Sequence, residues 1–338
     1  MKVGKISELM LNRSVFKLFR HRRKDIDKKP TSGVDASIMY TEDGESVAIS
    51  TNPVLLELDE LGKLAIYYVG NNLACVGAKM VGIMVNILMP NCSDEKDIKL
   101  IMNDLEEECG KLGIEVMGGH TQMTDAVNKT LVTVTGIGKI IKRDNISETT
   151  SNLGALKEIK PGFDIVMVKW AGMSGASIIA SKCEDELRTR LPGELIDNVK
   201  NLKKDISLLK EATIAKEHGA FYMHDITRGG VYAGLWELAT ATKKGLEVDI
   251  QKIPIRQDII EVCEFFDVNP YALDSRGALL VITADGESLA DAYFEQGIEA
   301  EVIGKIAEHK NKLIINEDEV RYLESPSTDE LNIFYENN

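Results

Sequence analysis

The sequence predicts a two-domain α+β protein, and three observations lead to this fold class. The chain has 338 residues, which is long for a single hydrophobic core, so two domains are expected. Its first half orders strands and helices as in an α+β domain whose helices cover one face of a largely antiparallel sheet. Its second half begins again with a strand at residues 164–170, after a polar stretch that ends at Pro161-Gly162.

The composition narrows the class of protein. With 44% hydrophobic and 28% charged residues, it is that of an ordinary soluble globular protein. The formal net charge of -14 argues against a general binder of nucleic acid or anionic membranes. No apolar run is long enough to span a membrane, and the N-terminus lacks the apolar core of a signal peptide. The five cysteines never form a C-x-x-C pair, which disfavours a disulfide framework or a zinc site. We therefore expect a reduced, cytoplasmic protein.

Residues 1–30 are expected to form a short amphipathic helix followed by a basic arm. The basic residues of the arm are Lys17, Arg20, Arg22, Arg23, Lys24, Lys28 and Lys29. In an otherwise acidic chain, this arm could bind phosphate. The charge pattern alone favours the other interpretation, a solvated and partly mobile segment.

Residues 31–150 are expected to form the N-terminal domain. Strands are predicted at residues 36–40, 46–50, 82–89, 114–117 and 130–141, and helices at residues 61–81 and 94–112. Ser93 or Asp94 is the predicted cap of the second helix. Asn72 lies in the middle of the first helix, where Asn is unfavourable, which suggests a polar role. The strand at residues 114–117 is expected to end at a glycine turn, Gly118-Gly119, followed by polar groups.

Residues 151–310 are expected to form the C-terminal domain, and residues 311–338 a terminal hairpin and tail. The strand at residues 164–170 leads into a glycine-bearing helix start at residues 171–176, and residues 185–204 are predicted to be a charged, helical surface excursion. Further helices are expected at residues 207–218, 256–266 and 287–296, and strands at residues 246–250, 278–283 and 299–306.

The stretch from Gly219 to Thr240 carries the clearest functional signal. Residues 220–223 are predicted to be a strand, residues 224–228 a polar turn, and Gly229-Gly230 the start of a helix. A glycine pair lets backbone N–H groups approach a ligand closely, and a helix start favours anions. Asp225 is suited to a cation and Arg228 to phosphate. The alternative is a buried turn in which Asp225 caps the helix and pairs with Arg228. The spacing leaves both interpretations open.

Six motifs, in this order, resemble the AIR-synthase-like superfamily. They are VDAS at residues 34–37, STNP at 50–53, LGKLAIYYVGNNLACVGAK at 61–79, GGHT at 118–121, HDITRGG at 224–230 and LDSRGALLV at 273–281. The superfamily includes aminoimidazole ribonucleotide synthase, the hydrogenase-maturation dehydratase, selenophosphate synthetase and thiamine-monophosphate kinase. The second half is most similar to the hydrogenase-maturation branch, and GGHT to an AIR synthase-related branch.

The resemblance implies a fold, a cofactor and a reaction. The expected fold has two α+β domains, and the N-terminal sheets of two subunits pack into a shared barrel in a homodimer. ATP is expected in a cleft between domains or subunits, with its phosphates on magnesium ions held by N-terminal carboxylates. The expected chemistry is ATP-dependent phosphorylation of an amide-like oxygen of a small molecule that the sequence does not identify.

The resemblance also assigns residues by position. Asp35 and Asp225 correspond to metal ligands, and Asp225 and Arg228 to catalytic residues. The expected nucleotide-binding residues are Asn52, Asn72, Gly118, Gly119, His120, Thr121, Thr227, Gly229 and Gly230.

Three positions depart from the superfamily. Asn52, Asn72 and Gln122 stand where a carboxylate is usual, and a site that loses these charges binds magnesium less well. Phosphoryl transfer then loses part of its electrostatic support. The chain also lacks the cysteines expected near the C-terminus of the hydrogenase-maturation enzyme and near the N-terminus of selenophosphate synthetase, which disfavours these two activities. Two hypotheses remain: an ATP-dependent enzyme, and a catalytically retired homologue with a regulatory or scaffolding role.

Overall fold

The computed structural model describes residues 4–27, 29–54, 61–140, 156–326 and 328–337. They divide into two compact units. We call Arg22–Lys28 with Asp35–Glu148 the N-terminal unit, and Met1–His21, Lys29–Val34 and Thr149–Asn338 the C-terminal unit. The domain boundary expected at residues 150–151 lies outside the described residues. In the described ranges, no helix is both long and apolar enough to cross a membrane.

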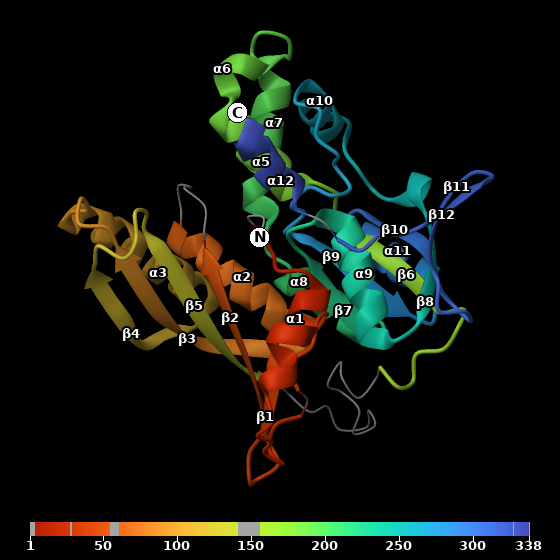
Figure 1. The fold of residues 1–338 in the computed structure, drawn as a ribbon, viewed down its shortest axis with the longest axis horizontal. Helices are drawn as coiled ribbons and strands as arrows, with labels where there is room; N and C mark the ends of the chain where they lie inside the picture. Colours follow the sequence, from red (N-terminus) through yellow and green to blue (C-terminus); the bar gives the residue numbers. More distant parts are fainter. Residues whose placement is uncertain (1–3, 28, 55–60, 141–155, 327, 338) are drawn as a thin grey trace. The chain divides into compact units, whose positions relative to one another are not determined.

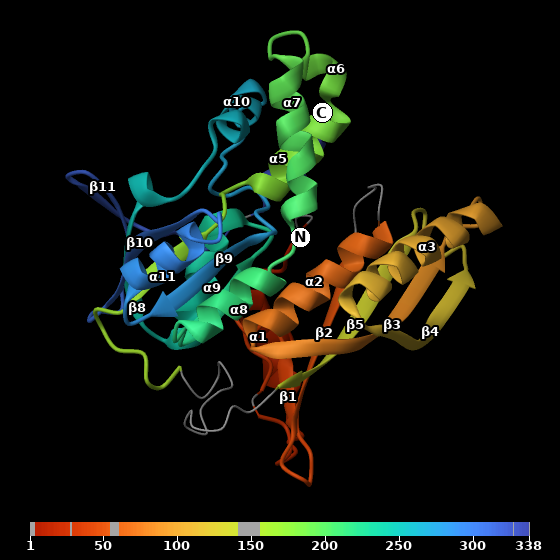
Figure 2. The same ribbon diagram turned by 180° about the vertical axis from the view of Figure 1, so that it is seen from behind.

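The N-terminal unit is a five-stranded sheet with two helices on one face, as the sequence predicts (Figures 1 and 2). Its strands are β1 (Ser37–Tyr40), β2 (Ser46–Val54), β3 (Ala78–Met89), β4 (Glu115–Met123) and β5 (Leu131–Ile140), and its helices are α2 (Leu61–Cys75) and α3 (Glu95–Leu112). The strand order is β1-β2-β5-β3-β4. All neighbouring strands are antiparallel except β3 and β4, which are parallel.

The predicted cap of α3 is confirmed. The Asp94 carboxylate accepts hydrogen bonds from the backbone N–H groups of Lys96 and Asp97, at 2.7 and 3.2 Å. The Asp97 carboxylate accepts one from the Asp94 N–H at 2.8 Å, which completes a capping box. The opposite end of the helix closes at Gly113, whose φ is +64°.

Two expectations for the N-terminal unit are wrong. The helix predicted at residues 61–81 ends at Cys75, because the chain turns at Gly77, whose φ is +73°, and enters β3 at Ala78. The predicted turn at Gly118-Gly119 is part of the continuous strand β4. A Cβ atom on Gly119 would lie 1.8 Å from the carbonyl oxygen of Val85, so this glycine permits close strand pairing.

The C-terminal unit is built on a seven-stranded sheet of order β12-β11-β8-β10-β6-β9-β7. The strands are β6 (Asp164–Val168), β7 (Tyr222–Ile226), β8 (Gly245–Asp249), β9 (Ala278–Thr283), β10 (Ala300–Ala307), β11 (Lys312–Asn316) and β12 (Glu319–Tyr322). The helices are α1 (Glu8–Ser14), α5 (Met173–Lys182), α6 (Glu184–Leu187), α7 (Gly193–Asn201), α8 (Leu209–Glu217), α9 (Gly230–Thr242), α10 (Gln257–Phe265), α11 (Gly286–Phe294) and α12 (Glu330–Asn337). The expected terminal hairpin is β11–β12, and the tail after it forms the helix α12.

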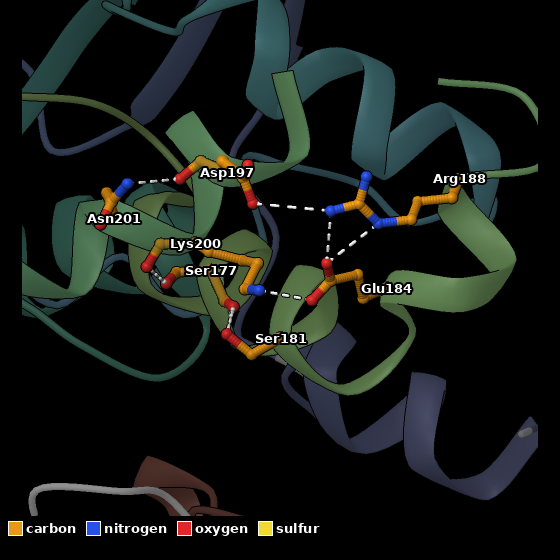
Figure 3. A network of polar contacts seen from close by, with 7 residues as sticks. All are labelled: Ser177, Ser181, Glu184, Arg188, Asp197, Lys200 and Asn201. Atoms are coloured by element: carbon orange, nitrogen blue, oxygen red, sulfur yellow. Dashed lines mark hydrogen bonds and ion pairs between the residues drawn. The ribbon is translucent and has the colours of Figure 1, made fainter. Parts of the chain in front are cut away.

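The charged helical excursion predicted at residues 185–204 is confirmed as α6 and α7, and a polar network joins it to α5. Figure 3 shows Glu184 between Arg188 and Lys200, both of which form ion pairs with it. These two cations, Lys200 first, lower the pKa of the Glu184 carboxyl group. Ser177 on α5 donates a hydrogen bond to the Lys200 carbonyl oxygen at 2.9 Å. The excursion is therefore a packed part of this unit.

The first thirty residues are divided between the two units. The α1 helix belongs to the C-terminal unit, where the Glu8 carboxylate accepts a hydrogen bond from Trp236 Nε1 at 2.7 Å. Residues 25–27 of the basic arm lie along β1 in the N-terminal unit. The Tyr40 N–H donates to the Asp25 carbonyl oxygen at 2.8 Å, and the Asp27 N–H to the Ile38 carbonyl oxygen at 3.0 Å. This part of the arm is held by backbone hydrogen bonds.

Candidate functional site

The sheet topology brings three glycine-bearing segments of the C-terminal unit together. β9 is antiparallel to both β6 and β7, so its start lies at the edge where β6 and β7 end. The glycine-bearing segments that follow β6 and β7 therefore meet the LDSRG segment that precedes β9. Ser275 from this segment contacts both: its Oγ accepts a hydrogen bond from the Gly172 N–H at 2.8 Å, and its own N–H donates to the Thr227 carbonyl oxygen at 3.4 Å.

The HDITRGG motif begins inside a strand. The prediction of a polar turn at residues 224–228 is wrong for its first three residues, since His224, Asp225 and Ile226 belong to β7 and are buried. His224 Nε2 lies 3.0 Å from Glu237 Oε2 on α9. This partner within the same unit compensates the burial of a polar side chain, which allows the strand to continue past Met223.

The glycine pair shapes the start of α9, and most of the amides there are already bonded. Gly229 and Gly230 have φ values of +87° and +63°. A Cβ on Gly230 would lie 2.5 Å from the Tyr271 carbonyl oxygen, so glycine is required by close packing as well as by its conformation. The Gly230 N–H donates to the Thr227 carbonyl oxygen at 3.1 Å, and the Tyr232 N–H to the Tyr271 carbonyl oxygen at 3.1 Å.

Asp329, which sequence analysis missed, supplies the carboxylate at the start of α9. Its Oδ2 accepts a hydrogen bond from the Gly229 N–H, and its Oδ1 accepts one from the Leu331 N–H at 2.8 Å. The interpretation in which Asp225 caps this helix is therefore wrong. No signal near residue 229 could identify the cap, because Asp329 lies 100 residues further along the chain.

Asp329 lies in an electrostatically strained group of buried side chains. Its burial and the nearby Asp274 raise its pKa to about 6, against the hydrogen bonds from Gly229 and Leu331 and the charge of Arg228. Asp274 is fully buried and forms an ion pair with Arg276. Arg228 is half-buried and, within the described part of the chain, takes part in no hydrogen bond or ion pair. An anionic ligand is a suitable partner for such a guanidinium.

A cavity of about 550 Å³ adjoins the start of α9 in the C-terminal unit. Its lining includes Gly229, Tyr232, Arg321, Ser325 and Glu330. The Arg321 guanidinium donates a hydrogen bond to the Tyr232 hydroxyl at 2.8 Å. The volume lies in the range of small-molecule sites.

In the N-terminal unit, three of the polar residues singled out by their sequence positions gather beside β2. Asn72 on α2 donates a hydrogen bond from Nδ2 to Ser50 Oγ at 2.8 Å, and Ser50 donates to the Asp35 carbonyl oxygen at 3.0 Å. Asn52 lies two residues after Ser50, on the same face of the strand. The structure therefore links Asp35 and Asn72 through Ser50, and Asn52 lies two residues further along the same face of β2.

The GGHT motif lies elsewhere on the same sheet. Asn52 is opposite Val134, Val134 opposite Val85, and Val85 opposite Gly119. These three strand spacings separate Asn52 from Gly119 by about 14 Å. Thr121 follows on β4, where His120 Nε2 lies 3.0 Å from Gln122 Oε1 and both side chains are exposed. Within one chain, GGHT and the Asn52–Asn72 group form two separate groups.

The fold and its glycine-rich segments define the class of protein. Residues 33–140 match the N-terminal domain, and residues 160–316 the C-terminal domain, of AIR synthase related protein. The chain belongs to this family, and its fold is the two-domain, mixed α+β AIR synthase fold. The resemblance expected from the six motifs is confirmed.

Relatives of known name lie in the hydrogenase-maturation branch. A putative hydrogenase expression/formation protein of Methanocaldococcus jannaschii is 24% identical over 285 residues, which cover 83% of this chain and 79% of that protein. The carbamoyl dehydratase HypE of Rhodobacter capsulatus is also 24% identical over 285 residues, with 80% of this chain and 79% of that protein covered.

Solved structures of this branch share the fold. The structure of a HypE–HypF complex matches with a TM-score of 0.71 and 19% identity, and covers 94% of this chain and 99% of the matched chain. The hydrogenase maturation protein HypE in complex with ATP matches with a TM-score of 0.63 and 17% identity, and covers 98% of both chains.

Proposed function

We propose that this protein binds ATP and transfers a phosphoryl group to an amide-like oxygen of a small molecule. The observation that carries the proposal is the intact D-x-T-R-G-G segment, in which Asp225 is buried on β7 and Arg228 has no ion-pair partner among the described residues. Related proteins named carbamoyl dehydratase, and a solved relative that contains ATP, support the same chemistry. These relatives offer no support for the catalytically retired alternative.

Each residue has a proposed role. Arg228 contacts the transferred phosphate and stabilises the charge that develops on it. Thr227 orients the phosphate through its hydroxyl, and Gly229 and Gly230 give the loop its shape. Asn52 and Asn72 orient phosphates or water from the N-terminal unit. Gly118, Gly119, His120 and Thr121 are proposed as a further nucleotide contact. The cavity beside Gly229 is the proposed substrate pocket.

Asp35 and Asp225 are the proposed ligands of a magnesium ion. Carboxylate oxygens suit this cation, and two of them with neutral amides nearby fit a weakly held ion better than a pair of ions. Bound magnesium would neutralise phosphate charge during transfer. In this chain, the Ser50 hydrogen bond to the Asp35 carbonyl oxygen fixes the backbone from which one ligand projects.

We also propose that the protein is a homodimer through the N-terminal sheet. Both α2 and α3 lie on one face, and no helix of the described N-terminal unit covers the other (Figure 2). On β3 the side chain of Met84 is 47% exposed, and Val81 nearby is 38% exposed. Uncovered apolar side chains on a sheet face are typical of an interaction surface.

Calorimetric titration of ATP and of its non-hydrolysable analogue into the purified protein, with and without magnesium, tests the proposal. We expect micromolar binding that strengthens with magnesium. The absence of heat under both conditions would contradict the proposal and leave the non-catalytic alternative.

A further inference from the structure

We propose that Lys5 is a phosphate-contacting residue of this site, so that the chain itself supplies positive charge next to the D-x-T-R-G-G segment. The inference rests on the proposed ATP binding and adds a residue from outside all six motifs. Lys5 Nζ lies 3.0 Å from Thr227 Oγ1 and 3.1 Å from Glu237 Oε1. It therefore reaches the D-x-T-R-G-G segment from a position 222 residues earlier in the sequence.

Contacts on both sides of Lys5 hold the N-terminal segment in place. Glu8 on α1 accepts a hydrogen bond from Trp236 Nε1 on α9 at 2.7 Å. Gly4, with a φ of +123°, packs so closely on α12 that an added Cβ would lie 2.8 Å from Asn332 Nδ2. Lys5 is thus held between two anchored neighbours, and about half of its side chain (49%) remains exposed to a ligand.

Glu237 allows Lys5 to change partners. Burial disfavours its charged form, but Lys5 and His224 outweigh burial and lower the pKa of Glu237 to about 2. Its two oxygens face different groups, Oε1 facing Lys5 and Oε2 facing His224. When the ammonium of Lys5 turns to a phosphate, Glu237 keeps its contact with His224.

The charges at the proposed ATP site favour an additional positively charged side chain such as Lys5. Asn52 and Asn72 stand where carboxylates are expected in a metal site, so fewer metal cations can be held there. A triphosphate still needs positive charge around it. A lysine ammonium is a compact charge with three donors that binds phosphate without fixed geometry. Lys5, whose ammonium contacts the Thr227 hydroxyl one residue before Arg228, can provide this charge.

The test compares Lys5→Met with Lys5→Arg, using Arg13→Met on the helix α1 that follows Lys5 as the matched control. ATP affinity is measured by calorimetry without magnesium, over a range of salt concentrations. We expect Lys5→Met to weaken ATP binding at least about tenfold and to flatten its salt dependence, because a charged hydrogen bond is lost. Lys5→Arg should keep most of the affinity, and Arg13→Met all of it. Trp236 fluorescence checks that α1 is still docked.

Glu237→Gln separates a ligand contact from a structural ion pair. If Lys5 contacts phosphate, releasing it from Glu237 should leave the ATP affinity equal or higher, whereas Lys5→Met should lower it. If the wild-type protein binds ATP and Lys5→Met binds it with the same Kd, the role of Lys5 is overturned, but the proposed function is not. A wild-type protein that binds no ATP would overturn the proposed function, and this inference with it.

Discussion

The side-chain amide of Asn72 donates a hydrogen bond to Ser50 Oγ at 2.8 Å, and Ser50 donates in turn to the carbonyl oxygen of Asp35 at 3.0 Å. The direction of these two hydrogen bonds depends on an amide at position 72, since a carboxylate cannot donate a hydrogen bond. With a carboxylate there, the Ser50 hydroxyl would turn toward it and the Asp35 carbonyl would lose its donor. The amide of Asn72 thus has a structural role in the N-terminal unit, in addition to any role as an uncharged ligand.

Replacing Asn72 therefore has a cost in the absence of ligands. We expect Asn72→Asp to lower the apparent free energy of unfolding by about 1–3 kcal/mol at neutral pH, because the hydrogen bond from Ser50 to the Asp35 carbonyl oxygen is lost. Asn52→Asp, at a half-exposed position on β2, should change it much less. Urea unfolding of the two variants measures the difference, and equal stabilities would show that the amide donor of Asn72 is not required.

Restoring the usual carboxylates tests whether the site is active as it stands. We expect the triple variant Asn52→Asp, Asn72→Asp and Gln122→Glu to bind magnesium with ATP more tightly, because the metal gains anionic ligands. Phosphate release should be detectable in both the parent and the variant. Turnover that occurs only in the variant would identify the parent as a retired enzyme.

Asp329 should make stability depend on pH in a defined direction. Its pKa is raised to about 6 in the folded protein, so the folded state binds the proton more tightly than the unfolded state does. The stabilisation is complete below about pH 4 and is lost as the pH rises through 6. The rise of the Asp329 pKa from its usual 3.8 to about 6 corresponds to about 3 kcal/mol.

We therefore expect the difference in unfolding free energy between wild type and Asp329→Asn to change by up to this amount between pH 4 and pH 7. The exposed Asp125→Asn serves as the control and should show no such change. Denaturant titrations at several pH values measure both. A constant difference across this range would rule out the raised pKa.

Gly230 should tolerate no side chain. Gly230→Ala places a Cβ 2.5 Å from the Tyr271 carbonyl oxygen at a φ of +63°, so backbone must shift. We expect a loss of at least about 3 kcal/mol in stability. Gly44→Ala is the matched control for Gly230→Ala, since Gly44 also has a positive φ, +81°, but no atom lies within 4 Å of the added Cβ. It should cost about 1 kcal/mol. Thermal unfolding distinguishes the two, and similar melting temperatures would contradict the prediction.

The uncovered sheet face should control assembly. We expect Met84→Lys to convert the proposed dimer to a monomer, because a charge would be buried in an apolar interface. Leu100→Lys is the control, because the exposed Leu100 lies on α3, on the side of the sheet opposite the proposed interface. Sedimentation velocity measures the outcome. A wild-type protein that sediments as a monomer would contradict the dimer itself.

The sequence by itself determined the fold class, the family and most element positions. Local patterns of apolar residues predicted β2, β5 and most of β3, and the Asp94 cap predicted the start of α3, because these signals are local. Local signals misled where packing overrides them. Gly118-Gly119 indicates a turn in isolation, but close pairing with β3 uses Gly119 within a strand. His224 and Asp225 are polar, yet a partner such as Glu237 allows His224 to lie inside β7.

Only the tertiary structure decided which distant residues reach the candidate site. Asp329 at the start of α9 and Lys5 beside Thr227 come from opposite ends of the chain, and neither lies in a motif. The sequence also placed Asn72 among nucleotide ligands without showing that Ser50 links it to Asp35. Such contacts depend on strand order and on how the chain ends fold back, which no spacing between neighbouring residues encodes. The residue types thus indicated the kind of chemistry at the candidate site, whereas long-range packing determined which side chains contact one another there.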